Sequence, residues 1–477
     1  MNKMKKIYIM ILLVLTGTMA MAQTSVWDGK RVIWTRGEGT EESPFLIESA
    51  QNLAYLAYVV NKGYNTENLY FRLTTDIDLN GSEDQQWIPI GMSDRWVSED
   101  GCDRRVQGVS GFSVINCFNG HFDGGEHSIS NLYIDNMERN FGAYNGLFGW
   151  VRSTDAENLA VVENLFVTSG YIKGIICGGI VGRADNALVS RCWNGATIEG
   201  YGSGSQDGSG GIVGWSSSFV QVRNCYNMGT ITGYSVAGIV GSGKAVIGEC
   251  YNEGDISGVY AGGIFGSSLM KPVTISNCYN TGSVSAIDGL VMSSLPAGPA
   301  AGGIAGFIFR TGDASGGSIT NCYNVGSVSS VKDAGCILAY GSNMTLENNY
   351  YITTCLAGGA GESLTEEYMQ SQEFVDFLNG LGTGQEWVID ENNTNGGFPI
   401  LVSIDLSVGE MPEVTFSVYP NPAQGQFTVE GKGTMRIANV MGQEILSRAI
   451  NGKETVNLPK GLYFIQMNGT VRKIVVE

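Results

Sequence analysis

Two short motifs alternate along the middle of the chain, and this internal repeat constrains the fold more than any other feature. One motif places glycines around an apolar pair, as in residues 178–182 (GGIVG), and the other joins a cysteine, an aromatic residue and an asparagine, as in 224–227 (NCYN). Successive cysteines of the second motif lie 33, 25, 28 and 44 residues apart. A constant motif at a variable spacing indicates regular coils from which loops extend, so the repeat predicts a solenoid.

The segments between the motifs are short, rich in Ile and Val, bounded by Gly and Asn, and without helical periodicity, which is typical of strands. Stacked coil upon coil, they predict a parallel β-helix whose equivalent positions form columns. Ile and Val are expected to fill the interior. Side-chain amides one rung apart, about 4.8 Å, are expected to form a hydrogen-bonded ladder. The asparagine column consists of Asn194, Asn227, Asn252, Asn280 and Asn324.

A cysteine column runs beside the asparagines, at Cys192, Cys225, Cys250, Cys278 and Cys322. Ten cysteines in an exported chain would ordinarily indicate disulfides. Parallel side chains in register are poorly aimed at each other, so this column is predicted to be buried free thiols. Cys102 and Cys117, in a region with many insertions, form the better candidate for a disulfide.

An aromatic residue follows each repeat cysteine: Trp193, Tyr226, Tyr251, Tyr279 and Tyr323, with Tyr350 in a degenerate last copy. Neighbouring residues on a strand point to opposite faces, so inward cysteines place these rings outside. An exposed aromatic column on an acidic solenoid would be a ligand-binding surface for glycan rings or a protein partner. The favoured interpretation is that the rings stack on one another and shield the sheet, because the regularity of the motif follows the fold.

The glycine motifs resemble the GLUG repeat of bacterial surface proteins. Segments further upstream follow that family's entry region in order: 37–47 (GEGTEESPFLI), 75–79 (TDIDL), 87–91 (WIPIG), 118–124 (FNGHFDG) and 146–149 (GLFG). The resemblance implies a right-handed β-helix, with loop insertions, over residues 23–355. Residues 356–410 are then expected to form a closing segment with a short helix and a linker.

The N-terminal residues predict a signal peptide over 1–22. A basic start is followed by an apolar run from 7 to 15 and by the small-residue step Ala20-Met21-Ala22. That run is too short to span a bilayer, which takes about 20 residues. Export with cleavage before Gln23 is expected, and the mature chain is expected to lack a transmembrane segment.

The last part of the chain changes character, because the glycine repeats stop and alternating strands begin. Residues 419–422 (YPNP), 440–444 (VMGQE) and 458–464 (LPKGLYF) resemble the type A sorting domain of the type IX secretion system of Bacteroidetes. The resemblance implies that residues 411–477 form a small immunoglobulin-like β-sandwich that engages the type IX secretion machinery. It also implies a protein secreted or attached to the outer cell surface.

Few residues suggest chemistry. The net charge of −18 argues against nucleic acid as a partner. Some relatives of the repeat family are metallopeptidases, yet the two histidines, His121 and His127, lack a zinc-binding motif. Asp123 or Glu126 could complete a metal site with them, but a polar turn is the favoured interpretation. No cofactor, metal site or catalytic residue is therefore assigned.

Many β-helices are polysaccharide lyases or glycosidases, which need converging carboxylates, and Asp76, Asp78 and Asp123 are the candidates. Short aspartates in this entry region are better explained as caps of turns. The sequence therefore favours a surface interaction protein, adhesin-like and binding glycan or protein. A carbohydrate-active enzyme and a structural surface-coat protein remain the alternatives.

Overall fold

The computed structural model describes residues 24–91, 116–136, 144–204, 207–289, 298–312, 316–381, 386–391, 393–402, 416–419, 423–439, 444–467 and 470–476. The chain divides into two units, residues 1–403 and 404–477. No helix among the described residues is long and apolar enough to cross a membrane.

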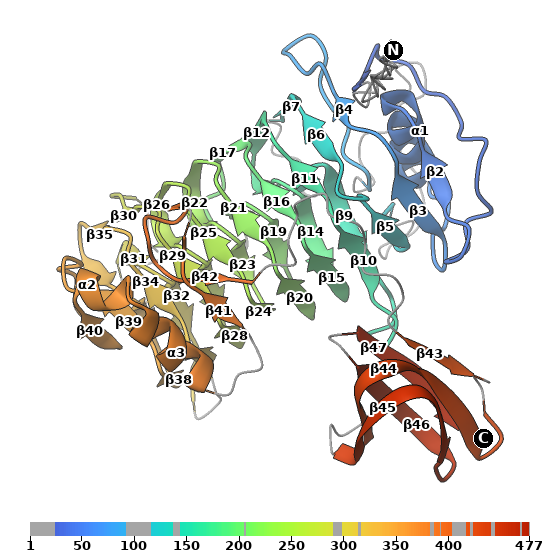
Figure 1. Cartoon of the computed structure of the whole chain (residues 1–477). Helices are drawn as coiled ribbons and strands as arrows, with labels where there is room; N and C mark the ends of the chain where they lie inside the picture. The colour runs from blue at the N-terminus through green and yellow to red at the C-terminus, as the bar shows by residue number, and fades with distance from the viewer. Residues whose placement is uncertain are drawn as a thin grey trace, which may run out of the picture. The chain divides into compact units, whose positions relative to one another are not determined.

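The first unit is a parallel β-helix, as predicted (Figure 1). A typical coil passes through four sheets, here called B, A, D and C, before the next coil begins in sheet B. Sheet A consists of β1 Ser25–Val26, β4 Ile77–Asp78, β6 Ser128–Ser130, β11 Phe166–Val167, β16 Trp193–Asn194, β21 Tyr226–Asn227, β25 Tyr251–Asn252, β29 Tyr279–Asn280, β34 Tyr323–Asn324, β39 Tyr350–Ile352 and β40 Glu362–Leu364. Sheet B consists of β2 Phe45–Ile47, β3 Tyr70–Leu73, β5 His121–Asp123, β10 Ala160–Glu163, β15 Ala187–Ser190, β20 Val220–Arg223, β24 Ala245–Gly248, β28 Val273–Ser276, β33 Gly317–Thr320 and β38 Met344–Glu347.

The other two sheets carry the glycine motifs. Sheet C consists of β9 Phe148–Arg152, β14 Val181–Asp185, β19 Val213–Ser216, β23 Val240–Gly243, β27 Phe265–Leu269, β32 Ala305–Phe309 and β37 Leu338–Gly341. Sheet D consists of β7 Leu132–Asp135, β8 Tyr144–Asn145, β12 Gly170–Gly174, β13 Ile176–Gly178, β17 Thr197–Gly200, β18 Gly208–Gly210, β22 Ile231–Ala237, β26 Ile256–Gly262, β30 Val284–Ala286, β31 Ala300–Gly302, β35 Val328–Ser330 and β36 Asp333–Gly335.

Equivalent residues of successive coils stack in register. In sheet B, Val189 pairs with Val222, Val222 with Ile247, and Ile247 with Ile275, all of them completely buried. Such in-register apolar columns bury the same positions in every coil. The hydrophobic effect therefore fixes the register of the whole stack.

The asparagines form the predicted ladder inside the solenoid. From Asn194 to Asn324, the Nδ2 of each asparagine donates to the Oδ1 of the next at 2.7 or 2.8 Å. Each Nδ2 also donates to a backbone carbonyl two residues later, as Asn252 does to Gly254 at 2.8 Å. All members of the ladder are completely buried. Their amides satisfy one another's hydrogen-bonding needs away from water.

The ladder explains why the glycine motif alternates with the cysteine motif. A Cβ on Gly238 would lie 2.3 Å from the Oδ1 of Asn252, and one on Gly263 would lie 2.5 Å from the Cγ of Asn280. Only glycine leaves room for the amides at this position. The two motifs are therefore one structural unit, in which Gly238 and Gly263 each make room for a buried amide.

The last coil departs from both motifs at once. Gly335 pairs with Gly302, so Cys336 occupies the place that Gly303 has in the preceding coil. Cys336 forms a disulfide with Cys355, and the Nδ2 of Asn324 lies 3.8 Å from the Sγ of Cys355. The asparagine ladder thus ends on a disulfide.

Both ends of the solenoid carry helices (Figure 1). Helix α1 (Ala50–Asn61) lies between β2 and β3 at the N-terminal end, and the Oγ of Ser49 caps it by accepting from the amide of Asn52. At the other end lie α2 (Glu366–Met369), α3 (Gln372–Gly380) and the antiparallel pair of β41 (Trp387–Val388) and β42 (Ile400–Leu401). These elements lie within the predicted closing segment, and from here on that name is used for residues 366–401 alone. Covered ends deny the sheets to further strands.

The second unit is antiparallel and all-β. Its strands are β43 Phe416–Tyr419, β44 Gln426–Asn439, β45 Glu444–Asn457, β46 Gly461–Met467 and β47 Thr470–Val476. In the described residues they form one sheet, in which β44 pairs with β43, β45 and β46. A separate core with Phe427, Ile437 and Ile465 supports this unit.

Candidate functional site

The aromatic column lies on the outer face of sheet A and forms a continuous stack. The ring centroids of Trp193 and Tyr226 are 5.5 Å apart, those of Tyr226 and Tyr251 4.8 Å, and those of Tyr251 and Tyr279 4.7 Å. The ring planes of the three tyrosines are within 2° of parallel from one pair to the next. Stacking covers the ring faces, so each ring presents mainly its edge to the outside.

The closing segment covers the C-terminal part of this stack, so two of the five candidate ligand-binding rings are closed off. Tyr323 is completely buried and Tyr279 is 2% exposed. Trp387 packs against both rings, at 6.0 Å from Tyr279 and 5.6 Å from Tyr323. The hydroxyl of Tyr323 donates to the carbonyl of Pro399 and accepts from Asn395. These two tyrosines anchor the closing segment and are unavailable to a ligand.

The remaining rings, Trp193, Tyr226 and Tyr251, are half-buried and form what is here called the open ladder. Burial raises the pKa of Tyr226 to about 12, so its hydroxyl is a neutral donor and acceptor at physiological pH. The hydroxyls of Tyr226 and Tyr251 have no hydrogen-bond partner among the described residues, and neither does the buried Nε1 of Trp193. The open ladder therefore presents two hydroxyls without partners, those of Tyr226 and Tyr251, whereas the Nε1 of Trp193 is closed off from solvent.

Two carboxylates flank the open ladder in the coil of Tyr251. Glu249 lies two residues before this ring, at the turn that precedes β25 with φ 55°, and Glu253 directly follows the strand. Burial raises the pKa of Glu249 despite Arg223, and burial followed by the charge of Asp390 raises the pKa of Glu253. Arg223 lies 3.5 Å from Glu249. Glu253 has no ion pair among the described residues.

The two histidines do not share a site. The Nε2 of His121 lies 2.6 Å from Glu163, whose other oxygen binds Arg191 at 2.9 Å. His127 lies 3.4 Å from Asp76 instead. No group of three or more metal-ligating side chains gathers anywhere in the described part of the chain. The zinc hypothesis therefore finds no support in the geometry.

The three candidate aspartates hold turns. The Oδ1 of Asp123 accepts from the amide of Gly125 and from Asn164, both at 2.8 Å. Asp78 accepts from the amide of Asn80 at 2.7 Å, and Asp76 accepts from the amide of Ser128 at 2.8 Å. These contacts match the turn-capping interpretation and give none of the three aspartates a free, converging carboxylate.

The cysteine column is buried and reduced, as predicted. Every member is a free thiol with no exposed surface. Each sulfur lies 3.1–3.2 Å from the carbonyl two residues earlier, and the amide of Cys192 donates to the Sγ of Cys225 at 3.4 Å. Cys117 is a half-buried free thiol, and Cys102 lies outside the described residues. The disulfide that forms joins Cys336 and Cys355, a pair that the sequence did not predict.

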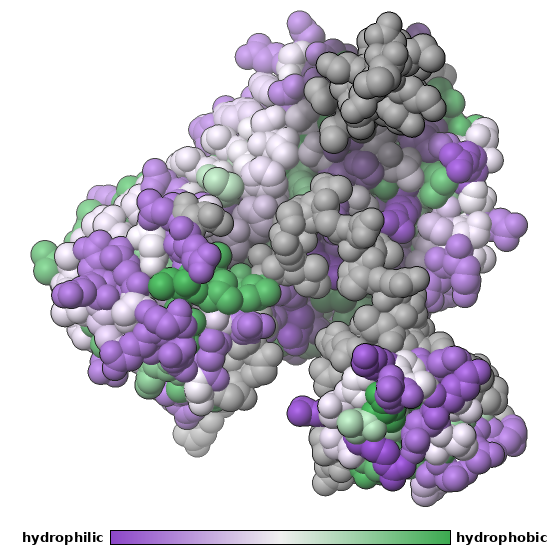
Figure 2. Space-filling model, in the orientation of Figure 1, coloured by the Kyte–Doolittle hydropathy of each residue, from purple (hydrophilic) through white to green (hydrophobic). Residues whose placement is uncertain are grey.

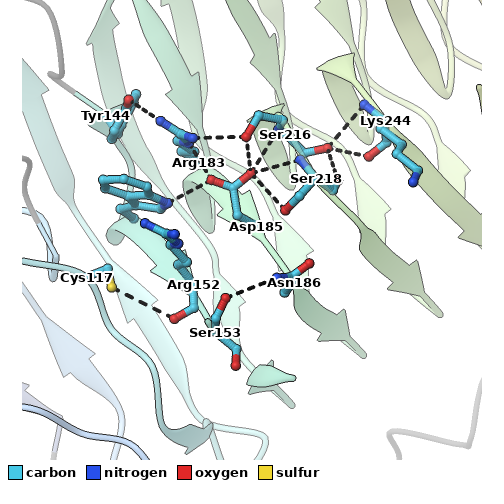
Figure 3. Close-up of polar contacts among 12 residues, drawn as sticks. Cys117, Tyr144, Arg152, Ser153, Arg183, Asp185, Asn186, Ser216, Ser218 and Lys244 are labelled. Atoms are coloured by element: carbon cyan, nitrogen blue, oxygen red, sulfur yellow. Dashed lines mark hydrogen bonds and ion pairs between the residues drawn. The ribbon is translucent and has the colours of Figure 1, made fainter. Parts of the chain in front are cut away.

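A polar cluster on sheet C was also missed (Figure 3). The guanidinium of Arg183 lies between the rings of Trp150 and Trp215, with its Cζ 4.2 and 4.4 Å from their centroids. Its Nε donates to Asp185 at 2.6 Å and its Nη1 to the hydroxyl of Tyr144 at 2.6 Å. Trp150, Arg183 and Trp215 each follow the last glycine of a glycine motif, so alignment of the repeats could have placed them in one column.

Asp185 organises the cluster. It accepts from the amides of Ser217 and Ser218 at 2.9 and 3.1 Å and from the Nε1 of Trp150 at 3.0 Å. Burial raises the pKa of this carboxyl, but Arg183 and the serine hydrogen bonds outweigh burial and hold the pKa below its ordinary value. Asp185 is therefore a stable anion at the centre of a largely buried network.

Comparison with known proteins identifies the second unit. Residues 417–477 match the family model described as the secretion system C-terminal sorting domain. The second unit is a secretion sorting domain. The protein is accordingly exported, and it is secreted or attached at the outer surface. Its sorting domain engages the secretion machinery.

Two curated proteins are similar to part of the chain. A Gly-rich membrane protein of Evansella cellulosilytica, so described, is 30% identical over 176 residues, which are 35% of this chain and 16% of that protein. Halomucin of Haloquadratum walsbyi is 29% identical over 178 residues, or 37% of this chain and 2% of halomucin. The chain thus spans less than a fifth of the length of either relative.

Two solved structures share features with the chain. One, from Bacteroides ovatus and described as an immunoglobulin A1 protease, aligns at a TM-score of 0.44 with 20% identity over 77% of this chain and 94% of its own. Another, described as IgA1 protease, aligns at a TM-score of 0.33 with 15% identity over 72% of this chain and 25% of its own. The GLUG resemblance itself stays a prediction.

Proposed function

We propose that the solenoid is an adhesin-like interaction module that binds a glycan chain along the open ladder. The observation that carries this proposal is the pair of unpartnered hydroxyls of Tyr226 and Tyr251, on a ring stack that begins at Trp193, on the outer face of a protein that acts outside the cell.

The chemistry of the open ladder favours a sugar. Phenol hydroxyls donate and accept, and carboxylates such as Glu253 accept from sugar hydroxyls. The edges of stacked rings add apolar contact for the C–H surface of a sugar. Coils about 4.8 Å apart repeat these groups along one line, which suits a ligand that is itself a repeating chain.

The hydropathy of the surface also favours a sugar over a protein as the ligand of the open ladder. On the face shown in Figure 2, the broadest apolar area lies over the closing segment, near β42. A protein partner that docks by hydrophobic burial needs such an area at its own site. The open ladder instead combines ring edges with hydroxyls and carboxylates.

A glycan array probed with the purified chain tests the proposal and selects a ligand for affinity measurements. Tyr226→Phe with Tyr251→Phe removes two hydroxyls and leaves the rings in place. At about 1 kcal/mol for each hydrogen bond, the double variant should bind about 25-fold more weakly. Tyr64→Phe, at an exposed tyrosine away from the ladder, is the matched control and should bind as the wild type does.

The alternatives have distinct outcomes in the same experiment. Release of reducing ends or unsaturated sugars, abolished by Asp123→Ala, would replace the proposal with a carbohydrate-active enzyme. Binding to host-matrix proteins without binding to any glycan would replace the sugar with a protein ligand. Unchanged affinity of the double variant would remove the open ladder from the binding site.

A further inference from the structure

A group of basic side chains lies at the corner where sheet C passes into sheet B. Arg152 ends β9, Lys244 follows β23, and Lys271 follows β27, so the three residues occupy equivalent corners of different coils. Arg183 belongs to β14 in the same region. Figure 3 shows Arg183 and Arg152 near Asp185, and the backbone of Lys244 bound to Ser216. These four residues are here called the basic corner. Their concentration contrasts with the net charge of −18 of the chain.

Cations and indole rings alternate through the basic corner. The Cζ of Arg152 lies 5.5 Å from the ring centroid of Trp150, and Arg183 fills the space between Trp150 and Trp215. The Nζ of Lys271 lies over the other face of Trp215, 5.3 Å from its centroid. Cation–π contacts hold Arg152, Arg183 and Lys271 in place without neutralising them.

The charges of the basic corner do not cancel. The guanidinium of Arg183 donates hydrogen bonds to Asp185, Tyr144 and Ser217. Arg152, Lys244 and Lys271 make no ion pair with a carboxylate in the described parts of the chain. The Nζ of Lys271 has only the carbonyl of Ser216, at 3.4 Å.

The uncancelled positive charges of the basic corner affect the pKa of Lys271. Burial lowers its pKa, and the positive charges of Arg183 and Lys244 add to this effect against the single charge of Asp185. Half-buried ammonium groups that repel one another are stabilised by an anion that replaces their lost hydration. The turn before Lys271 is itself held in an uncommon conformation, with Met270 at φ 66°.

We propose that the basic corner binds an acidic sugar, through a carboxylate or sulfate group that bridges Lys244 and Lys271. The anion follows from the unneutralised cations of the corner. The choice of a saccharide as its carrier rests on the proposed function of the open ladder.

The test measures binding of three probes to the full chain by calorimetry: an oligogalacturonide, its neutral methyl ester, and a chondroitin sulfate oligosaccharide. Binding of at least one acidic probe, with at least tenfold weaker binding of the methyl ester, is expected. Affinity should fall as salt rises, because salt screens charge. A chain that binds neither acidic probe, or that binds the ester equally well, overturns the proposal.

Variants locate the site. Lys244→Gln with Lys271→Gln should weaken the acidic probe at least tenfold, whereas Lys244→Arg with Lys271→Arg should retain it. Lys30→Gln with Lys332→Gln changes the net charge equally at distant exposed lysines and should leave the affinity unchanged. Equal losses in both glutamine pairs would show a general charge effect and overturn the site.

Two further binding measurements distinguish the basic corner from the open ladder. Tyr226→Phe with Tyr251→Phe should leave the acidic probe bound at the corner, so that either site can fail alone. Inorganic sulfate should bind at least tenfold more weakly than the sulfated oligosaccharide. Equal affinity for free sulfate would refute the saccharide and leave a simple anion site.

Discussion

Removal of one asparagine from the ladder should destabilise the solenoid strongly. Asn252 is completely buried, accepts from Asn227 at 2.8 Å, and donates to Asn280 at 2.7 Å and to the carbonyl of Gly254 at 2.8 Å. Asn252→Ala deprives the Oδ1 of Asn280 and the carbonyl of Gly254 of these partners. A buried polar group left without its partner costs about 1–3 kcal/mol, so the expected loss is about 4 kcal/mol.

Urea unfolding followed by circular dichroism measures this loss through the midpoint and slope of the transition. Asn158→Ala is the control, because Asn158 is exposed and lies outside the ladder; it should change the free energy of unfolding by less than about 0.5 kcal/mol. A loss for Asn252→Ala no larger than that of Asn158→Ala would refute the reasoning that the amides support one another.

Three more predictions follow from buried groups. Asp185→Asn should lower the free energy of unfolding by about 3 kcal/mol at pH 7, because it removes the anion that Arg183 pairs with. Because the pKa of Asp185 is depressed in the folded protein, this contribution is lost as the pH falls below the ordinary value of 3.8. The unfolding curves of the wild type and Asp185→Asn should therefore converge in acid. A difference that stays constant with pH would contradict the ion pair of Asp185 with Arg183. Iodoacetamide at pH 8 should leave Cys192, Cys250 and Cys322 unlabelled in the native chain, because burial raises the pKa of these thiols well above the ordinary value. Labelling is read by peptide mass spectrometry. Rapid labelling of these cysteines would exclude a closed interior. Cys336→Ala with Cys355→Ala should destabilise the last coil by about 3 kcal/mol and speed proteolysis of the closing segment; unchanged proteolysis would show that the disulfide does not secure that end.

The repeat made much of the solenoid predictable, because a residue's place in the motif sets its place in the coil. The asparagine ladder and the buried thiols could be predicted from periodicity and strand alternation alone. Cys336 also carried a signal, since it replaces the second glycine of a motif. Its pairing with Cys355 could not be predicted, because Cys355 lies in no repeat.

The candidate site was harder to predict than the fold, because its exposure depends on contacts between distant segments. Nothing in the repeat indicates that Trp387 and Asn395 cover Tyr279 and Tyr323, since the closing segment is not part of the repeat. The stacking of the rings, by contrast, was predictable, because in-register coils place one ring above the next. Arg183 was missed for a different reason, because its column varies in residue type while a repeat draws attention to constant positions.

Hydroxyl-radical footprinting of the chain with the glycan selected on the array tests the central claim most directly. Oxidation of each aromatic side chain, read by mass spectrometry, reports its exposure with and without the ligand. If the glycan binds along the open ladder, Trp193, Tyr226 and Tyr251 should be oxidised more slowly when the glycan is bound. The oxidation rate of Tyr64 should not change, and Tyr323 should be oxidised slowly with and without the ligand. Bound glycan that leaves the oxidation of the open ladder unchanged would contradict the account.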